Sequence, residues 1–294
     1  MIRVLVTGCK GQVGQALVKR LHHSTELLAL DRTDLDISNE KNVQKIIREF
    51  QPNFIINAAA YTAVDKAEDD AENAYAINRD GPQYLAQAAY DIDATLLHLS
   101  TDYVFSGQSK VAYCENDPTQ PLSVYGKSKL AGEEAVRRVN PRHIILRTAW
   151  VFCEEGNNFV KTMLRLSNSR TKLSIVDDQR GGPTYAGDIA NALISIVNNL
   201  SVHNDSNLYG TYHYTGAPDV SWFEFAQAIF CESERQGLQK APELVAIPSV
   251  EFPTPAIRPK NSVLNVEKIY NNFGILPSDW LCALSKLDEF RNKL

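Results

Sequence analysis

Residues 2–14, IRVLVTGCKGQVG, decide the fold of this chain, because they join a strand-like segment to a glycine-rich turn and the start of a helix. The apolar, β-branched segment Ile2–Val6 predicts a buried strand. Apolar residues recur at helical spacing in Gln12–His22, which predicts a helix with one apolar face. A strand, a turn and a helix in this order are typical of the first unit of a nucleotide-binding α/β fold.

The three glycines of the turn, Gly8, Gly11 and Gly14, stand at regular spacing. The first would allow a tight turn, the second would let backbone amides approach a pyrophosphate, and the third would let the helix pack closely on the strand. The helix N-terminus, with Gln12 and Val13, would add unpaired N–H groups for the anion. The turn therefore predicts a dinucleotide site, and a glycine-rich turn without a ligand is the alternative.

The alternation of strand-like and helix-like segments continues to about residue 150. It predicts strands over 27–30, 53–57, 95–100 and 143–148, and helices over 42–50, 71–90 and 124–139. Repeated βαβ units predict an α/β protein of the Rossmann type, with a doubly wound parallel sheet between two layers of helices. Farther along the chain we expect helices over 160–168, 188–199, 222–234 and 279–293 and a strand over 173–176.

A proline-rich stretch after residue 216 interrupts this rhythm and indicates a smaller C-terminal substrate-binding lobe. We expect residues 1–150 plus about 173–215 to form the dinucleotide-binding domain. The smaller lobe would then consist of about residues 151–172 plus 216–294.

Several side chains are candidates for the adenosine end of a dinucleotide. Asp31 closes the second predicted strand, where a carboxylate would meet the ribose hydroxyls, whereas the adjacent Arg32 could pair with a 2′-phosphate. The choice between NADH and NADPH therefore stays open. Asp36 and Ile37 would flank the adenine ring, although Asp36 could equally cap a surface turn.

Small residues follow the third predicted strand, and Ala59, Ala60 and Tyr61 would leave room for a ligand at the carboxyl edge of the sheet. Tight packing in the core is the alternative interpretation of the alanines.

The spacing Tyr125-x-x-x-Lys129 predicts a phenol and an ammonium on one face of a helix. A nearby ammonium would lower the pKa of the phenol and make Tyr125 a proton donor to a carbonyl oxygen. The predicted strand that ends at Ser100–Thr101 would bring a hydroxyl to the same oxygen, with Thr101 as the first choice. A solvated helix face is the alternative for the pair.

Composition excludes several classes of protein. The 294 residues carry a formal net charge of −5, so no overall basic field indicates a nucleic-acid partner. No apolar run approaches the roughly 20 residues of a membrane span, and no secretory signal is expected at the N-terminus. The five scattered cysteines form no metal-type pair, which fits a reducing, cytoplasmic location.

Eight motifs in order along the chain resemble the extended short-chain dehydrogenase/reductase family and, within it, the dTDP-4-dehydrorhamnose reductases. They are TGCKGQVG (7–14), NAAAYTAVDKAE (57–68), STDYVF (100–105), PLSVYGKSKLAGE (121–133), RTAWVF (147–152), NNFVKTMLRL (157–166), DQRGGPT (178–184) and RPKNSVLN (258–265). The resemblance implies reduction of the 4-keto group of a dTDP-linked sugar with NADPH or NADH.

Carried over position by position, the resemblance makes Tyr125 the proton donor, with Thr101 steadying the reacting oxygen. Lys129 would hold the nicotinamide ribose. The nucleotide-sugar substrate would meet Asp102, Trp150, Asn158, Phe159 and Arg258. Trp150 could instead be a core aromatic, and Arg258 could form a surface salt bridge.

Two departures limit the resemblance. Tyr61 stands where several relatives have a histidine, and the carboxylates of a magnesium-bridged dimer find no match here, so magnesium is not supported and either a monomer or a homodimer is expected. A nucleotide-sugar epimerase or dehydratase on the same scaffold is one alternative. The other is a non-catalytic, cofactor-binding subunit similar to the regulatory subunit of methionine adenosyltransferase.

Overall fold

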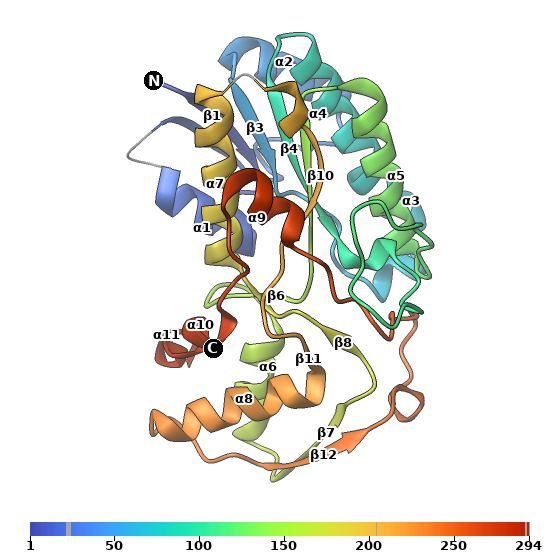
Figure 1. Cartoon of the computed structure of the whole chain (residues 1–294), viewed down its shortest axis with the longest axis vertical. Helices are drawn as coiled ribbons and strands as arrows, with labels where there is room; N and C mark the ends of the chain where they lie inside the picture. The colour runs from blue at the N-terminus through green and yellow to red at the C-terminus, as the bar shows by residue number, and fades with distance from the viewer. Residues whose placement is uncertain (22–24, 204, 292, 294) are drawn as a thin grey trace.

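The computed structural model describes residues 1–21, 25–203, 205–291 and 293, and its centre is a six-stranded parallel sheet (Figure 1). The strands lie in the order β10-β5-β4-β3-β1-β2. Their bounds are β1 Arg3–Thr7, β2 Glu26–Leu30, β3 Phe54–Asn57, β4 Thr95–Thr101, β5 His143–Thr148 and β10 Gly210–His213. The order in which successive strands are added to the sheet changes sides at β1. Strand β2 pairs with one edge of β1, and β3 pairs with the other edge. Ligands of such sheets bind at the carboxyl ends of the strands beside this reversal.

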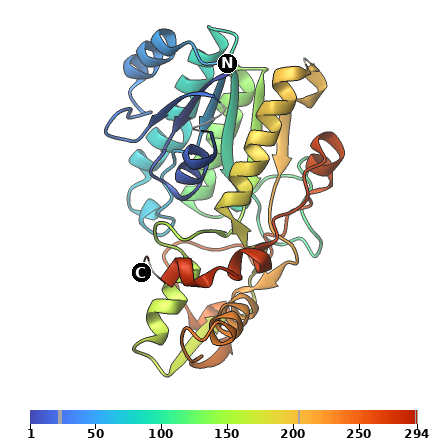
Figure 2. The ribbon, with the colours of Figure 1, turned by 90° about the vertical axis from the view of Figure 1, so that its left-hand side faces the viewer.

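Helices cover both faces of the sheet, as Figure 2 shows from the side. One face packs on α1 Gln12–Leu21, α7 Ala186–Val202 and α9 Glu267–Phe273. The other packs on α2 Glu40–Phe50, α4 Gly81–Tyr90 and α5 Val124–Val139. Within β1, Val4 and Val6 join the first of these cores and Leu5 joins the second, because successive side chains of a strand point to opposite faces. The predicted Rossmann-type sheet is confirmed.

The helix predicted over 71–90 is interrupted by a wider turn. Its parts are α3 Ala71–Tyr75, a π-helical segment (η2) Ala76–Asp80 and α4. Pro82 has no N–H with which to bond the carbonyl of Asn78 four residues earlier, so the regular ladder must change there. That carbonyl faces Gly132 of α5, where an added Cβ would lie 2.0 Å from it. The widened turn thus lets α5 approach closely.

A smaller lobe lies beyond the carboxyl edge of the sheet, at the lower end of Figure 1. Its apolar core is contributed by α6 Phe159–Ser167, α8 Trp222–Arg235, α10 Trp280–Leu284, α11 Leu287–Arg291 and β7 Lys172–Val176, which pairs with β12 Glu243–Ile247. Two short pairs join it to the rest: β6 Val151–Phe152 with β9 Thr184–Tyr185, and β8 Arg180–Gly181 with β11 Val220–Ser221. Single 3₁₀ turns are η1 Lys66–Glu68, η3 Asp102–Val104, η4 Ser206–Leu208 and η5 Ser249–Glu251.

Several details differ from the sequence predictions, and one of them is the edge strand β10, which was not predicted. The strand predicted over 173–176 is β7, but it pairs with β12 instead of joining the six-stranded sheet, so we propose that it belongs to the smaller lobe and not to the dinucleotide-binding domain. The proline-rich stretch contains the unpredicted strand β12. The single helix predicted over 279–293 is two short helices, α10 and α11. The predicted helix end at residue 22 and residue 292 within the helix predicted over 279–293 lie outside the described residues.

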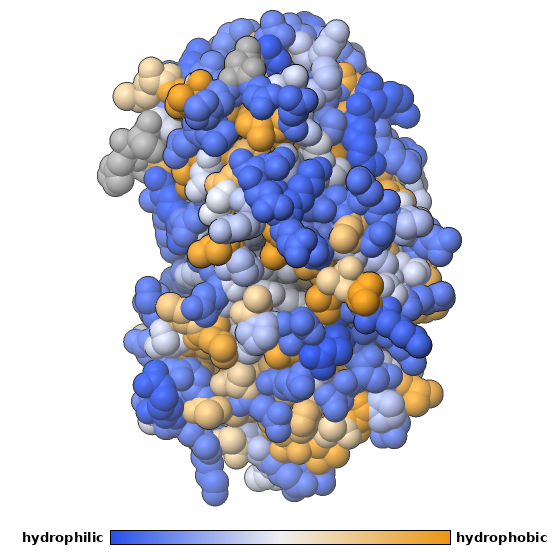
Figure 3. All heavy atoms as spheres, in the orientation of Figure 1, coloured by the Kyte–Doolittle hydropathy of each residue, from blue (hydrophilic) through white to orange (hydrophobic). Residues whose placement is uncertain are grey.

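Hydrophilic residues cover most of the face seen in Figure 3, and hydrophobic residues are scattered among them. Among the described helices, none combines the length and the apolar character that crossing a bilayer would require.

Candidate active site

The glycine turn is closed by contacts between backbone segments. Gly8 has a φ of +68°, and a Cβ on it would lie 2.6 Å from the backbone nitrogen of Ala59 at the end of β3. A Cβ on Gly14 would lie 2.1 Å from the carbonyl oxygen of Gly8. Side chains at either position would push the turn away from the neighbouring strand. Both positions therefore require glycine, and no Cβ there covers the backbone N–H groups of the turn.

A cavity of about 690 Å³ opens from this turn along the carboxyl edge of the sheet. This volume lies in the ordinary range for small-molecule sites. It is lined by every residue expected to bind cofactor except Gly14, namely Gly8, Gly11, Gln12, Val13, Asp31, Arg32, Asp36, Ile37, Ala59, Ala60, Tyr61, Tyr125 and Lys129. These residues come from five separate segments of the chain, and the fold brings them to one surface.

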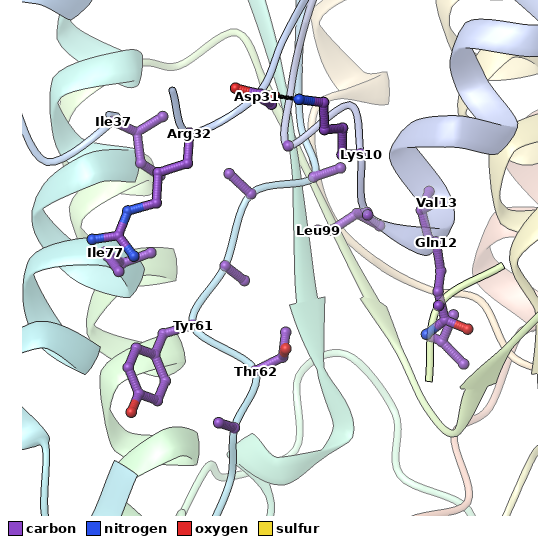
Figure 4. Close-up of a pocket in the computed structure, with 18 of the residues that line it drawn as sticks. Lys10, Gln12, Val13, Asp31, Arg32, Ile37, Tyr61, Thr62, Ile77 and Leu99 are labelled. Atoms are coloured by element: carbon purple, nitrogen blue, oxygen red, sulfur yellow. Dashed lines mark ion pairs between the residues drawn. The ribbon is translucent and has the colours of Figure 1, made fainter. Parts of the chain in front are cut away.

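The acidic residue at the end of β2 is already engaged. Oδ1 of Asp31 accepts hydrogen bonds from the N–H and hydroxyl of Thr33, both at 2.6 Å, and from the N–H of Asp34 at 3.2 Å. Its Oδ2 pairs with the ammonium of Lys10, as the dashed line in Figure 4 marks. These partners hold the pKa of Asp31 well below its ordinary value, chiefly through Lys10.

The opposite wall of the pocket carries Arg32 and Ile37, which lie across from Gln12 and Val13 in Figure 4. Ile37 is buried and touches Gly81 at the start of α4. Asp36 lines the cavity but accepts two hydrogen bonds from Ser38, from its N–H at 3.0 Å and from its hydroxyl at 2.6 Å. This carboxylate therefore also closes its own turn, as the alternative interpretation had it.

Tyr61 is fixed at both of its polar groups. Its N–H donates to Oδ1 of Asn78 at 2.8 Å, and its hydroxyl donates to Oδ2 of Asp70 at 2.9 Å. In Figure 4 the ring lies on the left side of the pocket, below Arg32 and Ile77. An aromatic face held in this way can pack on a flat ligand.

The phenol and the ammonium of the predicted pair both line the cavity, near the beginning of α5. The helix starts at the N-cap Ser123, whose hydroxyl accepts from the N–H of Gly126 at 3.1 Å. Gly126 is needed, because a Cβ there would lie 2.3 Å from the carbonyl oxygen of Tyr103. These two features set Tyr125 in the first turn of the helix and Lys129 one turn later.

The expected lowering of the tyrosine pKa by the lysine is absent. Burial, reinforced by the charge of Asp102, raises the pKa of Tyr125 to about 12, against a smaller opposite effect of its hydrogen bond with Thr101. The ammonium of Lys129 donates to the carbonyl oxygen of Leu99 at 2.6 Å, and burial lowers the pKa of Lys129 to about 8. Lys129 is not among the groups that shift the pKa of Tyr125, and burial alone is enough to keep the phenol protonated at neutral pH.

The two hydroxyls at the end of β4 have different partners. Thr101 donates to Oδ1 of Asp102 at 2.9 Å, and it is the one of these two hydroxyls that lowers the pKa of Tyr125 against the larger effect of burial. Ser100 donates to Oε1 of Glu133 at 2.6 Å. The pKa of Tyr125 responds to Thr101 and not to Ser100, and the role of Thr101 at the reacting oxygen stays a prediction.

Arg258 lies on the other side of the cleft and bridges the two parts of the molecule. Its Nη1 and Nη2 donate to Oδ1 and Oδ2 of Asp65 at 3.1 and 2.8 Å. It also lines a second hollow of about 630 Å³ that contains Arg180 and Lys260 beside the carboxylates of Asp177 and Asp178. Arg258 therefore forms an ion pair between the two lobes and also lines the second hollow.

The other expected sugar contacts are distributed over the junction of the lobes. Trp150 has a φ of +47° and stacks on Trp222, with ring centroids 3.5 Å apart and planes 6° apart. Asn158 caps α6 and donates to Oε1 of Gln12 at 3.1 Å, so it touches the glycine turn. Phe159 stacks on Phe225 inside the smaller lobe. Trp150, Asn158 and Phe159 do not line either of the two hollows described here.

Sequence reasoning missed three groups that shape the site. Lys10 stands inside the glycine motif and neutralises Asp31. Asp65, in the motif after β3, holds Arg258. Glu133 lies four residues after Lys129, a spacing that places both on one helix face, and it forms a buried pair with Arg147 at 2.7 Å. Only the last could have been found from spacing, since the partners of the first two depend on the fold.

No group of three or more His, Cys, Asp or Glu side chains able to hold a metal ion occurs within 1–21, 25–203, 205–291 and 293.

Comparisons with known proteins agree along the whole chain. The family model described as RmlD substrate binding domain matches residues 2–291. A dTDP-4-dehydrorhamnose reductase of Aggregatibacter actinomycetemcomitans is 51% identical over 293 residues, which are 99% of each chain. The crystal structure of a dTDP-4-dehydrorhamnose reductase from Clostridium acetobutylicum superposes with a TM-score of 0.91 at 39% identity, over 99% of this chain and 100% of that one. The Bacillus anthracis dTDP-4-dehydrorhamnose reductase, crystallised in complex with NADP, gives a TM-score of 0.88 at 38% identity, over 97% and 98% of the chains.

Proposed function

This chain belongs to the RmlD substrate binding domain family, and on that premise we propose that it is a reductase that converts dTDP-4-dehydro-L-rhamnose to dTDP-L-rhamnose with NADPH or NADH. One observation carries the proposal: a single cavity runs from the glycine turn to Tyr125 and Lys129. A dinucleotide and a reacting carbonyl can therefore lie end to end in it.

The residues of the cavity fit a nicotinamide dinucleotide. The turn around Gly8 and Gly14 has no room for a Cβ, so backbone N–H groups can reach a pyrophosphate. When bound, the cofactor supplies a hydride. Lys129 lies where an ammonium can hold the nicotinamide ribose, and Tyr61 offers a ring face along the path.

Tyr125 and Thr101 perform the proton chemistry at the sugar. The carbonyl oxygen at C4 would accept hydrogen bonds from the phenol and from the threonine hydroxyl, which polarise the C=O bond. As the hydride forms a C–H bond at C4, the C=O π electrons move to oxygen and the phenolic proton of Tyr125 is transferred to it, giving the C4 alcohol. Because the pKa of Tyr125 is about 12, the phenol carries its proton at neutral pH and can donate it in this step.

The nucleotide diphosphate would lie against the smaller lobe. Arg258 presents a planar fork of donors suited to two phosphate oxygens, and the nearby hollow adds Arg180 and Lys260. The diphosphate would have to share Arg258 with Asp65 or displace it.

The test is reduction of dTDP-4-dehydro-L-rhamnose, followed as loss of NADPH absorbance. Tyr125→Phe should bind NADPH as the wild type does and lose about 100- to 10,000-fold in kcat, because only the acidic proton is removed. Tyr84→Phe is a matched control, since this phenol packs among apolar residues on α4, away from the cavity. No turnover by the wild type, or full activity in Tyr125→Phe, would refute the proposal.

A further inference from the structure

The loop between β6 and α6 reaches the cofactor cavity from the smaller lobe. This β6–α6 loop consists of residues 153–158, and two of them, Gly156 and Asn157, line the cavity. Gly156 lies beside the start of α1, since a Cβ on it would be 3.5 Å from Cγ of Gln12. A dinucleotide places its diphosphate at this helix start. The β6–α6 loop is therefore close to the expected position of the diphosphate.

Ion pairs fix the loop on one side of these two residues. Oε1 of Glu155 pairs with the ammonium of Lys19 on α1 at 3.2 Å and with the ammonium of Lys293. The backbone carbonyl of Glu155 accepts a hydrogen bond from Sγ of Cys153 at 3.3 Å. Glu155 is thus attached to the helix that follows the glycine turn.

Asn158 fixes the loop on the other side. Its side-chain amide donates to the carbonyl of Cys153 at 2.6 Å and to Oε1 of Gln12 at 3.1 Å. Its Oδ1 accepts from the N–H of Lys161 at 3.2 Å, which caps the start of α6. The β6–α6 loop is therefore attached to α1 both before and after Gly156 and Asn157.

The two residues between these attachments have free hydrogen-bond donors. Neither Gly156 nor Asn157 forms a hydrogen bond with any other described residue, and both are exposed. Gly156 has a φ of +67°, a left-handed conformation that favours glycine. The free donors are the backbone N–H of each residue and the side-chain amide of Asn157. Such donors match the charged oxygens of a diphosphate.

We propose that the β6–α6 loop completes the diphosphate site of the cofactor: Gly156 and Asn157 donate to the diphosphate, and Glu155 positions them. The inference rests on the proposed function, from which it takes only that a nicotinamide dinucleotide occupies the cavity. It adds donors from the smaller lobe to those of the glycine turn. Cofactor binding then also fixes the smaller lobe relative to the sheet.

Asn157→Ala tests the contact directly. It should raise the Kd for NADPH by about tenfold, because it removes a hydrogen bond to a charged group. Asn157→Asp should raise the Kd further, since a carboxylate of the same shape cannot donate and repels the diphosphate. The measurement is titration with NADPH, followed by the fluorescence of the bound cofactor. Asn168→Ala, at the other end of α6, is the control and should leave the Kd unchanged. An unchanged Kd in both Asn157 variants would overturn the proposal.

Competing ligands show which part of the cofactor the loop contacts. Adenosine 2′-phosphate lacks the diphosphate, whereas 2′-phospho-ADP-ribose has the diphosphate and lacks nicotinamide. Asn157→Ala should weaken binding of 2′-phospho-ADP-ribose as much as that of NADPH, and should not weaken binding of adenosine 2′-phosphate. Equal weakening of all three ligands would mean a general disturbance of the cavity, and weakening of NADPH alone would mean a contact with nicotinamide. Either result would overturn the contact with the diphosphate.

Glu155→Gln tests the positioning role. It removes both ion pairs with little change of shape, and because exposed pairs are weak the Kd for NADPH should rise about twofold to fivefold. The same change should cost less in the Asn157→Ala background, because Glu155 then has one contact fewer to position. Lys172→Ala is the control, since it removes an exposed ion pair with Glu243 between β7 and β12. Additive losses, or an equal rise in the control, would overturn the positioning by Glu155.

Binding measurements keep this inference apart from the proposed reaction. If the wild type binds NADPH and reduces no keto-sugar, the proposed reaction fails, and a raised Kd in the Asn157 variants still supports the diphosphate contact. If the wild type reduces the keto-sugar and the Asn157 variants bind NADPH as tightly as it does, the diphosphate contact fails and the proposed reaction stands.

Discussion

At the scale of the residue, the carboxylate of Asp31 stands where it could bind the cofactor ribose, but its oxygens already have partners within the protein. Both of its oxygens are taken, one by Thr33 and Asp34 and the other by Lys10. A ribose hydroxyl would have to displace one of these partners. Lys10 neutralises Asp31, so the guanidinium of Arg32 is left to pair with a 2′-phosphate, although the carboxylate of Asp36 lines the same cavity.

Arg32→Ala should therefore raise the KM for NADPH by about tenfold or more and change the KM for NADH little, because a charge-assisted hydrogen bond contributes about 1.5–3 kcal/mol. The measurement is initial rate against each cofactor at saturating keto-sugar. Lys10→Ala is the companion variant. It frees the Asp31 carboxylate, so it should also weaken NADPH binding and should improve NADH binding. Equal changes in the KM values for NADPH and NADH would contradict the inference that Arg32 and Lys10 favour NADPH.

At the scale of the element, α5 is tied to the sheet by a buried ion pair. Glu133 is fully buried and accepts from Arg147 of β5 through both oxygens, at 2.9 and 2.7 Å. It also accepts from Ser100 of β4 at 2.6 Å. Two strands and the catalytic helix therefore meet at one carboxylate, one turn beyond Lys129.

Glu133→Gln should destabilise the protein by about 3–5 kcal/mol at neutral pH, because it leaves the Arg147 guanidinium buried without a counter-charge. The measurement is urea unfolding. Hydrogen bonding and the charge of Arg147 lower the pKa of Glu133 in the folded state. Its stabilisation is then complete above the unfolded pKa and is lost as the pH falls through the folded value, so the gap between wild type and variant should narrow below about pH 4.

Arg137→Ala is the control for this element, because Arg137 reaches the same carboxylate from a side chain that is 36% exposed. It should cost less than about 1 kcal/mol. Comparable losses in the two variants would mean that burial of the pair is not what stabilises the helix.

A helix or strand could be predicted from the sequence where its structure depends on nearby residues, and not where it depends on a contact with a distant segment. β1 to β5 and α5 were predicted because each buries a face whose period can be read in the sequence itself. The sequence did not predict the widened turn before Pro82 or the pairing of β7 with β12. The first depends on a carbonyl that meets Gly132, and the second on a strand about 70 residues away.

The candidate site follows the same rule. The cofactor residues were predicted because they directly follow strands, whose carboxyl ends must meet at one edge. Asp65 and Arg258 are 193 residues apart and come from different lobes, so nothing in either segment indicates the pair. The pKa of Tyr125 was misjudged for a similar reason, since desolvation depends on what covers the phenol and not on the spacing to Lys129.

At the scale of the whole molecule, the two lobes meet through polar bridges across the cleft. Asp65 holds Arg258 on one side of it, and Gln12 accepts from Asn158 on the other. Both bridges involve residues that a bound cofactor or nucleotide sugar could contact. Binding can therefore change the number of bonds that hold the lobes together.

Arg258→Lys should raise the KM for the nucleotide sugar by about tenfold, because an ammonium cannot replace the bidentate fork at a diphosphate, and should leave the KM for NADPH within about twofold. Steady-state kinetics with each substrate varied in turn make the measurement. An equal rise in both KM values would show that Arg258 acts by holding the lobes together and not by contact with the diphosphate.

The stacked indoles of Trp150 and Trp222 provide an intrinsic signal in near-ultraviolet circular dichroism. One ring follows the last residue of β5 and the other opens α8, and their transitions are coupled at a centroid distance of 3.5 Å. The third tryptophan, Trp280, is 2% exposed and donates its indole N–H to the carbonyl of Pro218. Any ligand that tilts the small lobe by a few degrees would alter the near-ultraviolet dichroism of the pair, without a label or a coupled assay.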